Sequence, residues 1–574
     1  MVHTKLHELK PCIAVLDRWG QRYDPEHGLP GETIASPGYH TTLPDGMRVH
    51  STRTALDYVL LLLTAGEAKH VKRAGDVLRK VLLLQDTDPC SATYGIWPWF
   101  LEEPLSQMAP PDWNWADFCG ARLAVVLADH ADRLPGNVME ATRTALGHAA
   151  WSIFRRNVQP SYTNIAVMGG VVAAAAGELL DEPSLVSYGR RRLQQVVAHA
   201  EHHGGFAEYN SPTYTMVVLA EVERCLQLVQ DAATRDAAET LRQRVWSTIA
   251  EHYHPVTGQW AGPHARTYHD TLLTSTVARL RRRVGSSFST PLATNAENID
   301  GEEVGVQPLP CPPQYLPYFE RLSKSDVQRR HRFRQGSEGH ERQALIGTTW
   351  LHDQVTLASI NRDTLWTQCR PLIGYIASSD DFAVTLRVRL LKDGRDWASG
   401  LLHTEQNRSH TLSVMTLLQD GGDYHLHLDR PADGTFHFSD LRLRIELHGK
   451  GVMVTQLDNS RFTLQTNDWK VVVHAPEGVG QFPCGTTPDW QSHQQVDSAV
   501  VDAVLHNGLE TALTLNALTE PHWLAFALEL LPADAKPATT PIRCEVESGI
   551  LNARWPRTES LAVKCPVQPE RRLP

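Results

Sequence analysis

The spacing of apolar residues changes once along this 574-residue chain, and the change divides it into two halves of different secondary structure. From about residue 50 to residue 283, apolar residues recur at steps of three and four, which is typical of α-helices with one buried face. From residue 343 onward they alternate with polar residues, which is typical of half-buried β-strands. A chain of this length exceeds what one core can fill, so we expect a multidomain protein, α first and then β.

The first half is a series of helical pairs. The helices that the pattern predicts cover residues 52–65, 70–85, 121–131, 138–154, 164–180, 183–200, 212–229 and 233–252. Residues 171–177 are apolar on nearly all sides, whereas residues 190–199 are charged on one face. An inner ring of buried helices inside an outer ring of half-exposed ones produces this alternation, so we predict an (α/α) toroid, an incomplete helical barrel. A right-handed helical solenoid has the same periodicity and is the alternative.

The second half predicts an antiparallel β-sandwich. Residues 382–390 and 441–448 alternate between apolar and polar side chains, and hairpin turns such as 420–423 separate the strands. Residues 286–313 hold prolines, glycines and acids without a period, which indicates an interdomain connector, and residues 314–334 are expected to form one or two short helices. We therefore place the toroid at residues 1–335, with the connector at about 284–335, and the sandwich at residues 336–574.

Three polar segments lie at nearly equal spacing in the helical half. Asn164 follows Tyr162 and Thr163, Tyr214 ends a glycine-led segment that begins at Gly204, and Arg266 closes a Pro-His-Ala-Arg segment. The separations are 50 residues from Asn164 to Tyr214 and 52 residues from Tyr214 to Arg266. Helical hairpins of that length bring such residues to one mouth of a ring, so we predict that the three segments meet there.

An amide, a phenol and a guanidinium suit the removal of a proton beside a carboxylate. In a uronic acid this proton is on C5, and β-elimination then expels the glycosidic oxygen from C4. Asn164, with Arg266 or His264, would stabilise the charge that develops on the carboxylate. Tyr214 would act as base and acid, provided that positive charge from Arg266 or His264 lowers its pKa from about 10. The predicted enzyme is a carbon–oxygen lyase acting on a uronate-containing polysaccharide or oligosaccharide.

Two segments carry a family resemblance. Residues 162–170 and 205–214 resemble the Asn-containing helix and the Glu- and Tyr-containing segment of heparinase II/III-like and alginate lyases, which combine a toroid with a β-sandwich. The resemblance implies that Tyr214 is the acid/base. Residues 359–375, with Trp366 and Arg370, also look like a strand pair of related lyases. Ile165 departs from the pattern, because many relatives have Asn, His or Trp there, so a histidine neutraliser has to come from His202, His203 or His264.

An aromatic stretch resembles the sugar-stacking wall of such lyase clefts. The residues to which we assign substrate contacts are Trp97, Trp99, Trp113, Trp115, Glu208, Tyr209, Asn210 and His203. The four tryptophans also fit a helical core. Glu208 also fits a structural ion pair or the orientation of Tyr209 and Asn210.

The proposed catalytic residues have structural alternatives. Asn164 could cap a helix, Tyr214 could be a core residue, and Arg266 could pair with Asp270 one helical turn later. Two other functions also fit the toroid. One is a glycoside hydrolase that uses Asp117 and Glu208, and the other is a glycan-binding protein without activity.

Charge and cysteine content restrict the partners. The net charge of −10 is spread without basic blocks, which disfavours nucleic acid as a partner and leaves an acidic glycan as the expected one. Nine cysteines lie far apart, which fits free thiols in a reducing compartment. The longest apolar run, residues 58–63, is too short for a membrane span, so we expect a cytoplasmic protein, or a secreted or periplasmic one if a leader has been removed.

No cofactor is expected to be required. The sandwich histidines are predicted on strand surfaces: His403, His410, His425, His427, His437 and His474. His425 and His427 would share one strand face, where they could hold a structural divalent metal.

Overall fold

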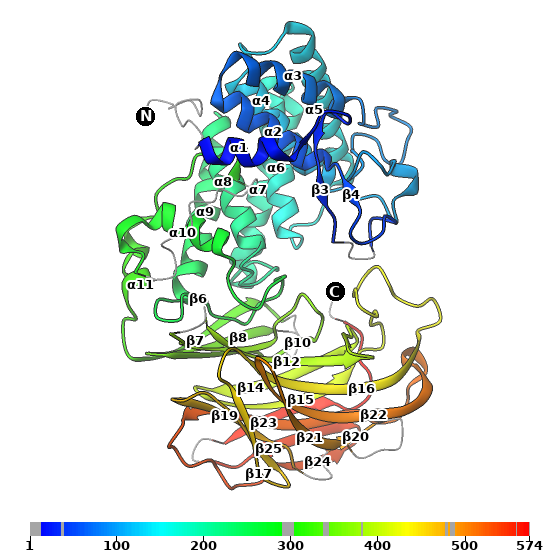
Figure 1. Ribbon diagram of the computed structural model, residues 1–574. Coiled ribbons are helices and arrows are strands. Elements are labelled where there is room, and N and C mark those ends of the chain that lie inside the picture. The colour runs from blue at the N-terminus through cyan, green and yellow to red at the C-terminus, as the bar shows by residue number, and fades with distance from the viewer. Residues whose placement is uncertain are drawn as a thin grey trace.

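The computed structural model describes residues 13–35, 39–289, 303–336, 344–379, 383–476, 480–482, 488–557 and 560–572. It consists of a helical domain followed by a domain of antiparallel sheets (Figure 1). The predicted fold class, an (α/α) toroid followed by a β-sandwich, is confirmed. Among the described residues, no helix is long and apolar enough to cross a membrane.

In the part of the chain that the structure describes, four helical hairpins and three further helices form the helical domain. The helices are α1 (Ile13–Arg22), α2 (Thr52–Ala65), α3 (Ala68–Leu82), α4 (Trp115–Asp129), α5 (Gly136–Arg156), α6 (Thr163–Leu179), α7 (Pro183–His203), α8 (Tyr214–Leu228), α9 (Ala232–His252), α10 (Thr274–Val284) and α11 (Pro317–Glu320). Helices α2, α4, α6 and α8 contact one another in that order, and α3, α5, α7 and α9 cover them on the outside. Because a Cβ on Gly189 would lie 2.4 Å from the carbonyl oxygen of Gly170, α6 and α7 pack with almost no side chain between them.

Short 3₁₀ helices and two-residue strands shape the connections. They are η2 (Leu105–Gln107), η3 (Gly285–Ser287), η6 (Pro313–Tyr315) and η8 (Leu515–Ala517), with the ribbons β1 (Tyr23–Asp24) and β2 (Leu29–Pro30), β3 (Glu32–Thr33) and β4 (Arg48–Val49), and β5 (Tyr253–His254) and β6 (Gln259–Trp260). The ribbon β5–β6 leads into residues 261–271, which run along the boundary between the two domains.

Part of the predicted connector lies inside the helical domain. The buried carboxylate of Glu303 accepts hydrogen bonds from Arg279 Nε over 2.7 Å and from Arg283 Nη1 over 2.6 Å. A Cβ on Gly305 would lie 2.9 Å from Leu60 and 3.2 Å from Val125, on two of the inner helices. The prediction of a linker is therefore wrong for residues 303–306, because these residues fill the interior of the toroid. Residues 290–302 of the predicted connector lie outside the described residues.

Over the described residues of the second domain, two large antiparallel sheets form the sandwich. One sheet has the order β21 (Asp489–Gln495), β22 (Ser498–Thr514), β16 (Thr435–His448), β12 (Val384–Lys392), β11 (Leu372–Ile376), β9 (Val355–Ile360), β8 (Leu345–His352) and β7 (Asp326–Arg334), with β13 (Arg395–Asp396) beside β12. The other has the order β10 (Arg362–Thr364), β14 (Gly400–Asn407), β15 (His410–Leu417), β23 (Trp523–Pro532), β19 (Trp469–His474), β18 (Arg461–Gln465) and β17 (Met453–Asp458), with β20 (Gly480–Gln481) beside β23. Their alternating apolar side chains, among them Leu386, Leu443 and Phe526, form one core between the sheets.

The sandwich begins earlier than the sequence predicts. Strand β7 pairs along its length with β8, so the sheet starts at Asp326 and not at residue 336. The predicted short helices are limited to η6 and α11, and the rest of residues 314–334 is mainly strand. A third sheet, β24 (Arg543–Glu547), β25 (Ile550–Trp555) and β26 (Leu561–Pro566), packs its apolar side chains against β15 and β23. Phe382, which begins one predicted strand, lies outside the described residues.

Residues 264–270 join the two domains. The backbones of His264 and Arg370 exchange two hydrogen bonds, of 3.1 and 2.8 Å, and the Arg370 side chain pairs with Asp270. The hydroxyl of Tyr375 donates to the Asp270 carbonyl over 2.6 Å. Asp270 therefore pairs with the sandwich, and the alternative in which it pairs with Arg266 is wrong.

Candidate functional site

A cavity of about 690 Å³ lies between the mouth of the toroid and the sandwich. It brings together six residues that the sequence singled out from separate segments, namely Trp99, Trp115, Asn164, Glu208, Tyr214 and Arg266. Asn164 lies in the first turn of α6 and Tyr214 begins α8, so the two inner helices present these side chains at their N-terminal ends. Arg266 comes from the boundary segment after β6.

Glu208 holds Asn164 in place. Both oxygens of the Glu208 carboxylate accept from Asn164 Nδ2 over 2.8 Å, and Oε2 also accepts from the backbone N–H of Asn164 over 2.9 Å. The carboxylate thus serves as the N-terminal cap of α6, where the helix dipole favours negative charge. The side chain of Asn164 does not cap the helix, so that alternative for Asn164 is wrong. Its Oδ1 is buried and has no hydrogen-bond partner among the described residues.

Tyr214 lies against Arg266. Arg266 Nη2 donates to the Tyr214 hydroxyl over 3.1 Å, and the guanidinium stands 4.9 Å from the centre of the Tyr214 ring. The same guanidinium lies 4.7 Å from the Trp366 ring, and its Nε donates to Gln368 Oε1 over 2.9 Å. Tyr268, which is 48% exposed, shares a 2.7 Å hydrogen bond with the Tyr214 hydroxyl. Arg266 is therefore fixed by both domains, and Tyr214 is a cavity residue and not a core residue.

The expected lowering of the Tyr214 pKa is not what the surroundings produce. Burial raises the pKa of Tyr214 well above its ordinary value, and the charge of Arg266 opposes this shift only in part. The hydroxyl of Tyr214 is therefore protonated at neutral pH in the unliganded protein. In this state it is ready to donate a proton to a leaving oxygen.

Two histidines of the sandwich line the same cavity. His425 and His427 lie in turns between β15 and β16, and not on a strand surface as predicted. In Figure 1 this loop rises from the sandwich toward the helical domain. Asp429 holds the loop by accepting from the backbone N–H groups of Asp423, Tyr424 and His425. Gly421 and Gly422 before the histidines and Pro431 after them are the sequence signals of a loop.

The protonation of these two histidines follows from their hydrogen bonds. His425 Nδ1 accepts from the backbone N–H groups of His427 and Leu428, each over 3.2 Å, so its proton is on Nε2. His427 Nδ1 accepts from Arg572 Nη1 over 3.1 Å, which places its proton on Nε2 as well. Burial lowers the pKa of each to about 4. Both are therefore neutral N–H donors at neutral pH.

The aromatic wall of the cavity differs from the prediction in two of four positions. Trp99 and Trp115 line the cavity, with ring centres 5.1 Å apart. Trp97 is fully buried in the helical core and donates to the Val81 carbonyl, and Trp113 packs against that core and donates to the Ala92 carbonyl. The prediction that Trp97 and Trp113 belong to the wall is wrong. Aromatic residues that the prediction did not assign to the wall complete it: Tyr39, Phe118, Tyr162, Tyr268 and Trp366.

Three predicted site residues lie behind the cavity. The hydroxyl of Tyr209 donates to Asp363 Oδ2 over 2.5 Å, and Asn210 Nδ2 donates to the carbonyls of Ala261 and Pro263. His264 is buried, and its Nδ1 lies 2.7 Å from the Asn210 carbonyl. These side chains do not line the cavity; they hold the boundary segment that carries Arg266.

The remaining histidine candidates lie elsewhere. His203 Nδ1 accepts from the backbone N–H of Gln335, and the exposed His202 stacks edge-on against His203. They belong to the junction of α7 with β7 and do not line the cavity. The sequence assigned a histidine of the site to His202, His203 or His264, whereas the histidines that line the cavity near Arg266 are His425 and His427.

A smaller cavity of about 360 Å³ adjoins the first one. The two share Ser161, Glu208, Arg266, Trp366 and His427. The smaller cavity adds Asp363 and three arginines, Arg334, Arg362 and Arg572. Two of these arginines lie near carboxylates, because Arg362 is 3.4 Å from Glu570 and Arg572 is 3.7 Å from Asp420.

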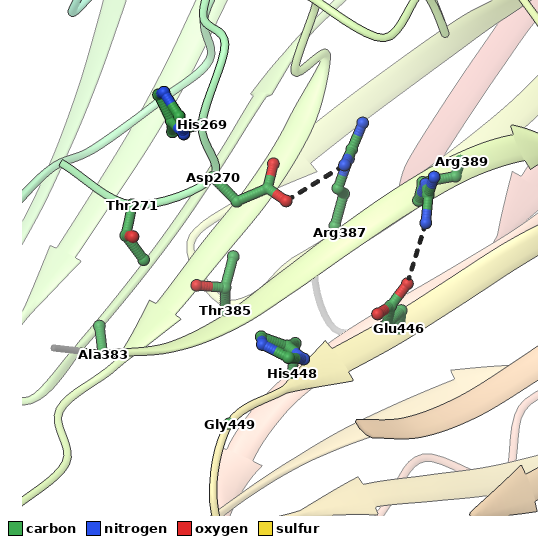
Figure 2. Close-up of a pocket in the computed structure, with 10 residues that line it drawn as sticks. All are labelled: His269, Asp270, Thr271, Ala383, Thr385, Arg387, Arg389, Glu446, His448 and Gly449. Atoms are coloured by element: carbon green, nitrogen blue, oxygen red, sulfur yellow. Dashed lines mark hydrogen bonds and ion pairs between the residues drawn. The ribbon is translucent and has the colours of Figure 1, made fainter. Parts of the chain in front are cut away.

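A separate cavity of about 400 Å³ lies at the domain boundary beyond Asp270 (Figure 2). Its charges are paired: Arg387 Nη1 lies 3.1 Å from Asp270 Oδ2, and Arg389 Nη1 lies 3.6 Å from Glu446 Oε2. Because the Asp270–Arg387 pair crosses the domain boundary, we interpret this cavity as part of the interdomain joint.

Comparisons with known proteins give one family and several distant structures. Residues 35–280 match the model of a domain of unknown function (DUF8769). No curated protein matches. Among solved structures, a Streptomyces coelicolor A3 chondroitin AC lyase in complex with chondroitin sulphate is 10% identical, with a TM-score of 0.48, and the match covers 95% of this chain and 85% of that one. A heparan sulfate lyase from Pedobacter heparinus is 10% identical, with a TM-score of 0.36, and covers 90% of this chain and 82% of that one. Alginate lyase A1-III from Sphingomonas species A1 is 11% identical, with a TM-score of 0.31, and covers 53% of this chain and 89% of that one.

Proposed function

We propose that the protein is a lyase that cleaves a uronate-containing polysaccharide or oligosaccharide by β-elimination. The observation that carries the proposal is that Asn164, Tyr214 and Arg266 line one cavity although they are far apart in the sequence. Elimination next to a carboxylate needs donors for the carboxylate and an acid/base for the C5 proton and the C4 oxygen. These three side chains supply both functions.

In this proposal the substrate carboxylate binds between donors from both domains. On the toroid side, Asn164 Nδ2 donates to both oxygens of Glu208 in the free protein and turns one N–H to the substrate carboxylate when the substrate binds. Arg266 is held by Tyr214 and Gln368. His425 adds a neutral N–H donor from the sandwich loop. Together they stabilise the second negative charge that develops on the carboxylate when the C5 proton leaves.

Tyr214 carries the proton from C5 of the uronate to the C4 oxygen. Its phenolate removes the proton from C5, and the resulting phenol returns it to the C4 oxygen as the glycosidic bond breaks, leaving a double bond between C4 and C5. The unsaturated uronate is the new non-reducing end of one fragment, and the expelled oxygen, which receives the proton, becomes the hydroxyl of a new reducing end on the other fragment. His425 and His427 are poor bases here, because the Nδ1 atoms already accept hydrogen bonds and the Nε2 atoms carry the protons.

The charge of the cleft supports an acidic glycan as substrate. Arg334, Arg362 and Arg572 line the adjoining cavity, where further carboxylate or sulfate groups of a chain would lie. The wall of Trp99, Trp115 and Trp366 offers flat surfaces for the sugar rings.

Among the described residues that line the larger cavity, no pair of carboxylates is free to serve the hydrolase alternative. Asp117 is buried, lies 3.9 Å from Arg156 and does not line the cavity. Asp112 and Glu208 do line it, but Asp112 accepts from Trp99 Nε1 and from the backbone of Asn114, and both Glu208 oxygens accept from Asn164. A general acid and a base for hydrolysis need carboxylates that face the sugar.

The test is the absorbance of unsaturated uronate products. The protein is incubated with alginate, glucuronan, heparinoids, chondroitin and rhamnose-linked glucuronates, and the ultraviolet absorbance and the reducing ends are followed together. We expect both to rise on at least one substrate, and both to rise about 10² to 10⁴ times more slowly with Tyr214→Phe. Reducing ends without absorbance would indicate a hydrolase, and binding without either product would indicate a glycan-binding protein.

A further inference from the structure

A cluster of two imidazoles and a carboxylate lies outside the cleft, at the N-terminal hairpin formed by β1 and β2. Asp24 in β1, His27 in the turn after it and His50 before α2 each offer one atom that could bind a metal ion, and the three atoms lie within 4.8 Å of one another. His27 Nδ1 and His50 Nε2 lie 3.0 and 3.3 Å from the same oxygen, Asp24 Oδ2. We propose that these three residues bind a divalent transition-metal ion of the zinc class.

Two of the three distances between the donor atoms fit such an ion. Bonds of about 2.0–2.1 Å in tetrahedral geometry place neighbouring donor atoms about 3.3 Å apart. The two nitrogen-to-oxygen distances at Asp24 are close to this value. Two histidines and one carboxylate form a donor set typical of zinc and related ions, whereas calcium and magnesium need sets made mainly of oxygen.

The surroundings orient the proposed ligands. His50 Nδ1 lies 2.5 Å from Glu102 Oε1, so Nε2 is the ring nitrogen that faces Asp24 and could bind the ion. A carboxylate behind a metal-binding histidine fixes the ring and increases its basicity. The other oxygen of Asp24, Oδ1, accepts from the backbone N–H groups of Glu26 and His27, so only Oδ2 faces the two rings.

The two rings lie face to face. The rings of His27 and His50 are stacked with their centres 4.4 Å apart, and each ring has one nitrogen within 3.3 Å of Asp24 Oδ2.

The ion would fasten the N-terminal hairpin to a wall of the cleft. The His50 carbonyl accepts from the backbone N–H of Leu101 over 3.0 Å. The backbone N–H of Thr52 donates to the Trp99 carbonyl, also over 3.0 Å. Glu102 connects the same segment to the His50 ring. A bound ion would therefore stabilise the segment that carries Trp99, and it would be structural rather than part of the reaction.

The test is binding of Zn²⁺ alone to the full-length protein after treatment with a chelator. We expect one Zn²⁺ per chain by calorimetry and metal analysis, together with a rise in Tm. His27→Gln, on a partly exposed turn, and Asp24→Asn should each abolish this binding, and Glu102→Gln should weaken it about 10- to 100-fold. His202→Gln, in an exposed histidine cluster, is the matched control and should bind as the wild type does.

Two results would overturn the assignment. One is the failure of the chelator-treated wild type to take up one ion per chain. The other is unchanged affinity in both His27→Gln and Asp24→Asn, with circular dichroism confirming that the variants are folded.

Discussion

Arg266 Nη2 donates to the hydroxyl of Tyr214 over 3.1 Å, and its guanidinium also covers the Tyr214 ring. The same guanidinium packs on Trp366 and donates to Gln368, both from the sandwich. The acid/base of the proposed site therefore depends on the contact between the two domains. A change in how the domains sit would move the positive charge away from the phenol.

Tyr214→Phe tests the acid/base. The substitution keeps the ring and removes only the hydroxyl, so turnover should fall by about 10² to 10⁴ while binding of a uronate oligosaccharide persists. Tyr268→Phe is the matched control, because it removes the exposed partner of the same hydrogen bond and should leave most of the turnover. Steady-state kinetics and calorimetric binding measure the two effects. Near-normal turnover in Tyr214→Phe would exclude Tyr214 as the acid/base.

Asn164→Ala tests the carboxylate donor. Loss of one such donor typically lowers turnover by about 10² to 10³. The backbone N–H of Asn164 still donates to Glu208 in this variant, so α6 keeps its cap and Tm should change little. Glu208→Ala, in contrast, should lower both turnover and Tm, because it removes the cap and leaves the Asn164 amide unpaired. Equal losses of Tm in the two variants would contradict this division of roles.

Trp97 and Trp99 should respond in opposite ways although only Pro98 separates them. Trp97 is fully buried, so Trp97→Ala should destabilise the protein by about 3–5 kcal/mol. Trp99 lines the cavity, so Trp99→Ala should mainly raise KM for an oligosaccharide. Urea unfolding and steady-state kinetics of both variants provide the comparison. A raised KM with normal stability in Trp97→Ala would contradict its placement in the core.

The periodicity of the sequence predicted the elements well because each helix or strand buries one face. The helix predicted at 52–65 has these bounds in the structure, and those predicted at 183–200 and 233–252 differ from α7 and α9 by one to three residues at one end. Helix α4 begins at Trp115 rather than at residue 121, because in its first turn Trp115 and Phe118 line the cavity while Asp117 is buried. A first turn that lines a cleft does not follow the period of a helix with one apolar buried face.

The sequence could also predict Asn164, Tyr214 and Arg266 as neighbours, because equal hairpins repeat a position at one mouth. It could not predict which side of the chain Trp97 or Trp113 would face, since both lie in a segment without a period. His425 was missed as a cleft residue because its approach to Tyr39, 4.5 Å between ring centres, depends on how two distant domains pack. Contacts of that kind leave no local pattern.

Acid should destabilise the fold through its buried histidines. Burial lowers the pKa of His254 and His264 to about 4 and that of His403 to about 3, against about 6.5 in an unfolded chain. Between pH 6.5 and 4 the unfolded chain therefore binds protons that the folded protein does not, so the free energy of unfolding falls as the pH falls. Burial raises the pKa of Asp117 to about 7, which acts in the opposite direction over the same range.

Urea unfolding between pH 4 and pH 8 measures this dependence. His264→Gln should make the free energy of unfolding depend less on pH, because the unfolded chain then takes up one proton fewer. Asp117→Asn should make it depend more on pH, because the carboxyl whose raised pKa acts in the opposite direction is removed. A free energy of unfolding that stays constant from pH 6.5 to pH 4 in the wild type would contradict the burial of these histidines.

The pH dependence of kcat/KM should identify the base. This quantity reports the ionisation of the free enzyme, in which burial holds the Tyr214 hydroxyl protonated at neutral pH. If the phenolate removes the C5 proton, kcat/KM should keep rising with pH through the alkaline range in which the enzyme stays folded. Arg266→Lys should shift this rise, because a lysine keeps the charge but loses the fixed hydrogen bond to Tyr214 and the stacking on Trp366. A rise completed near pH 4 would instead assign the base to His425 or His427, whose pKa values are about 4, and would limit Tyr214 to donating the proton to the leaving oxygen.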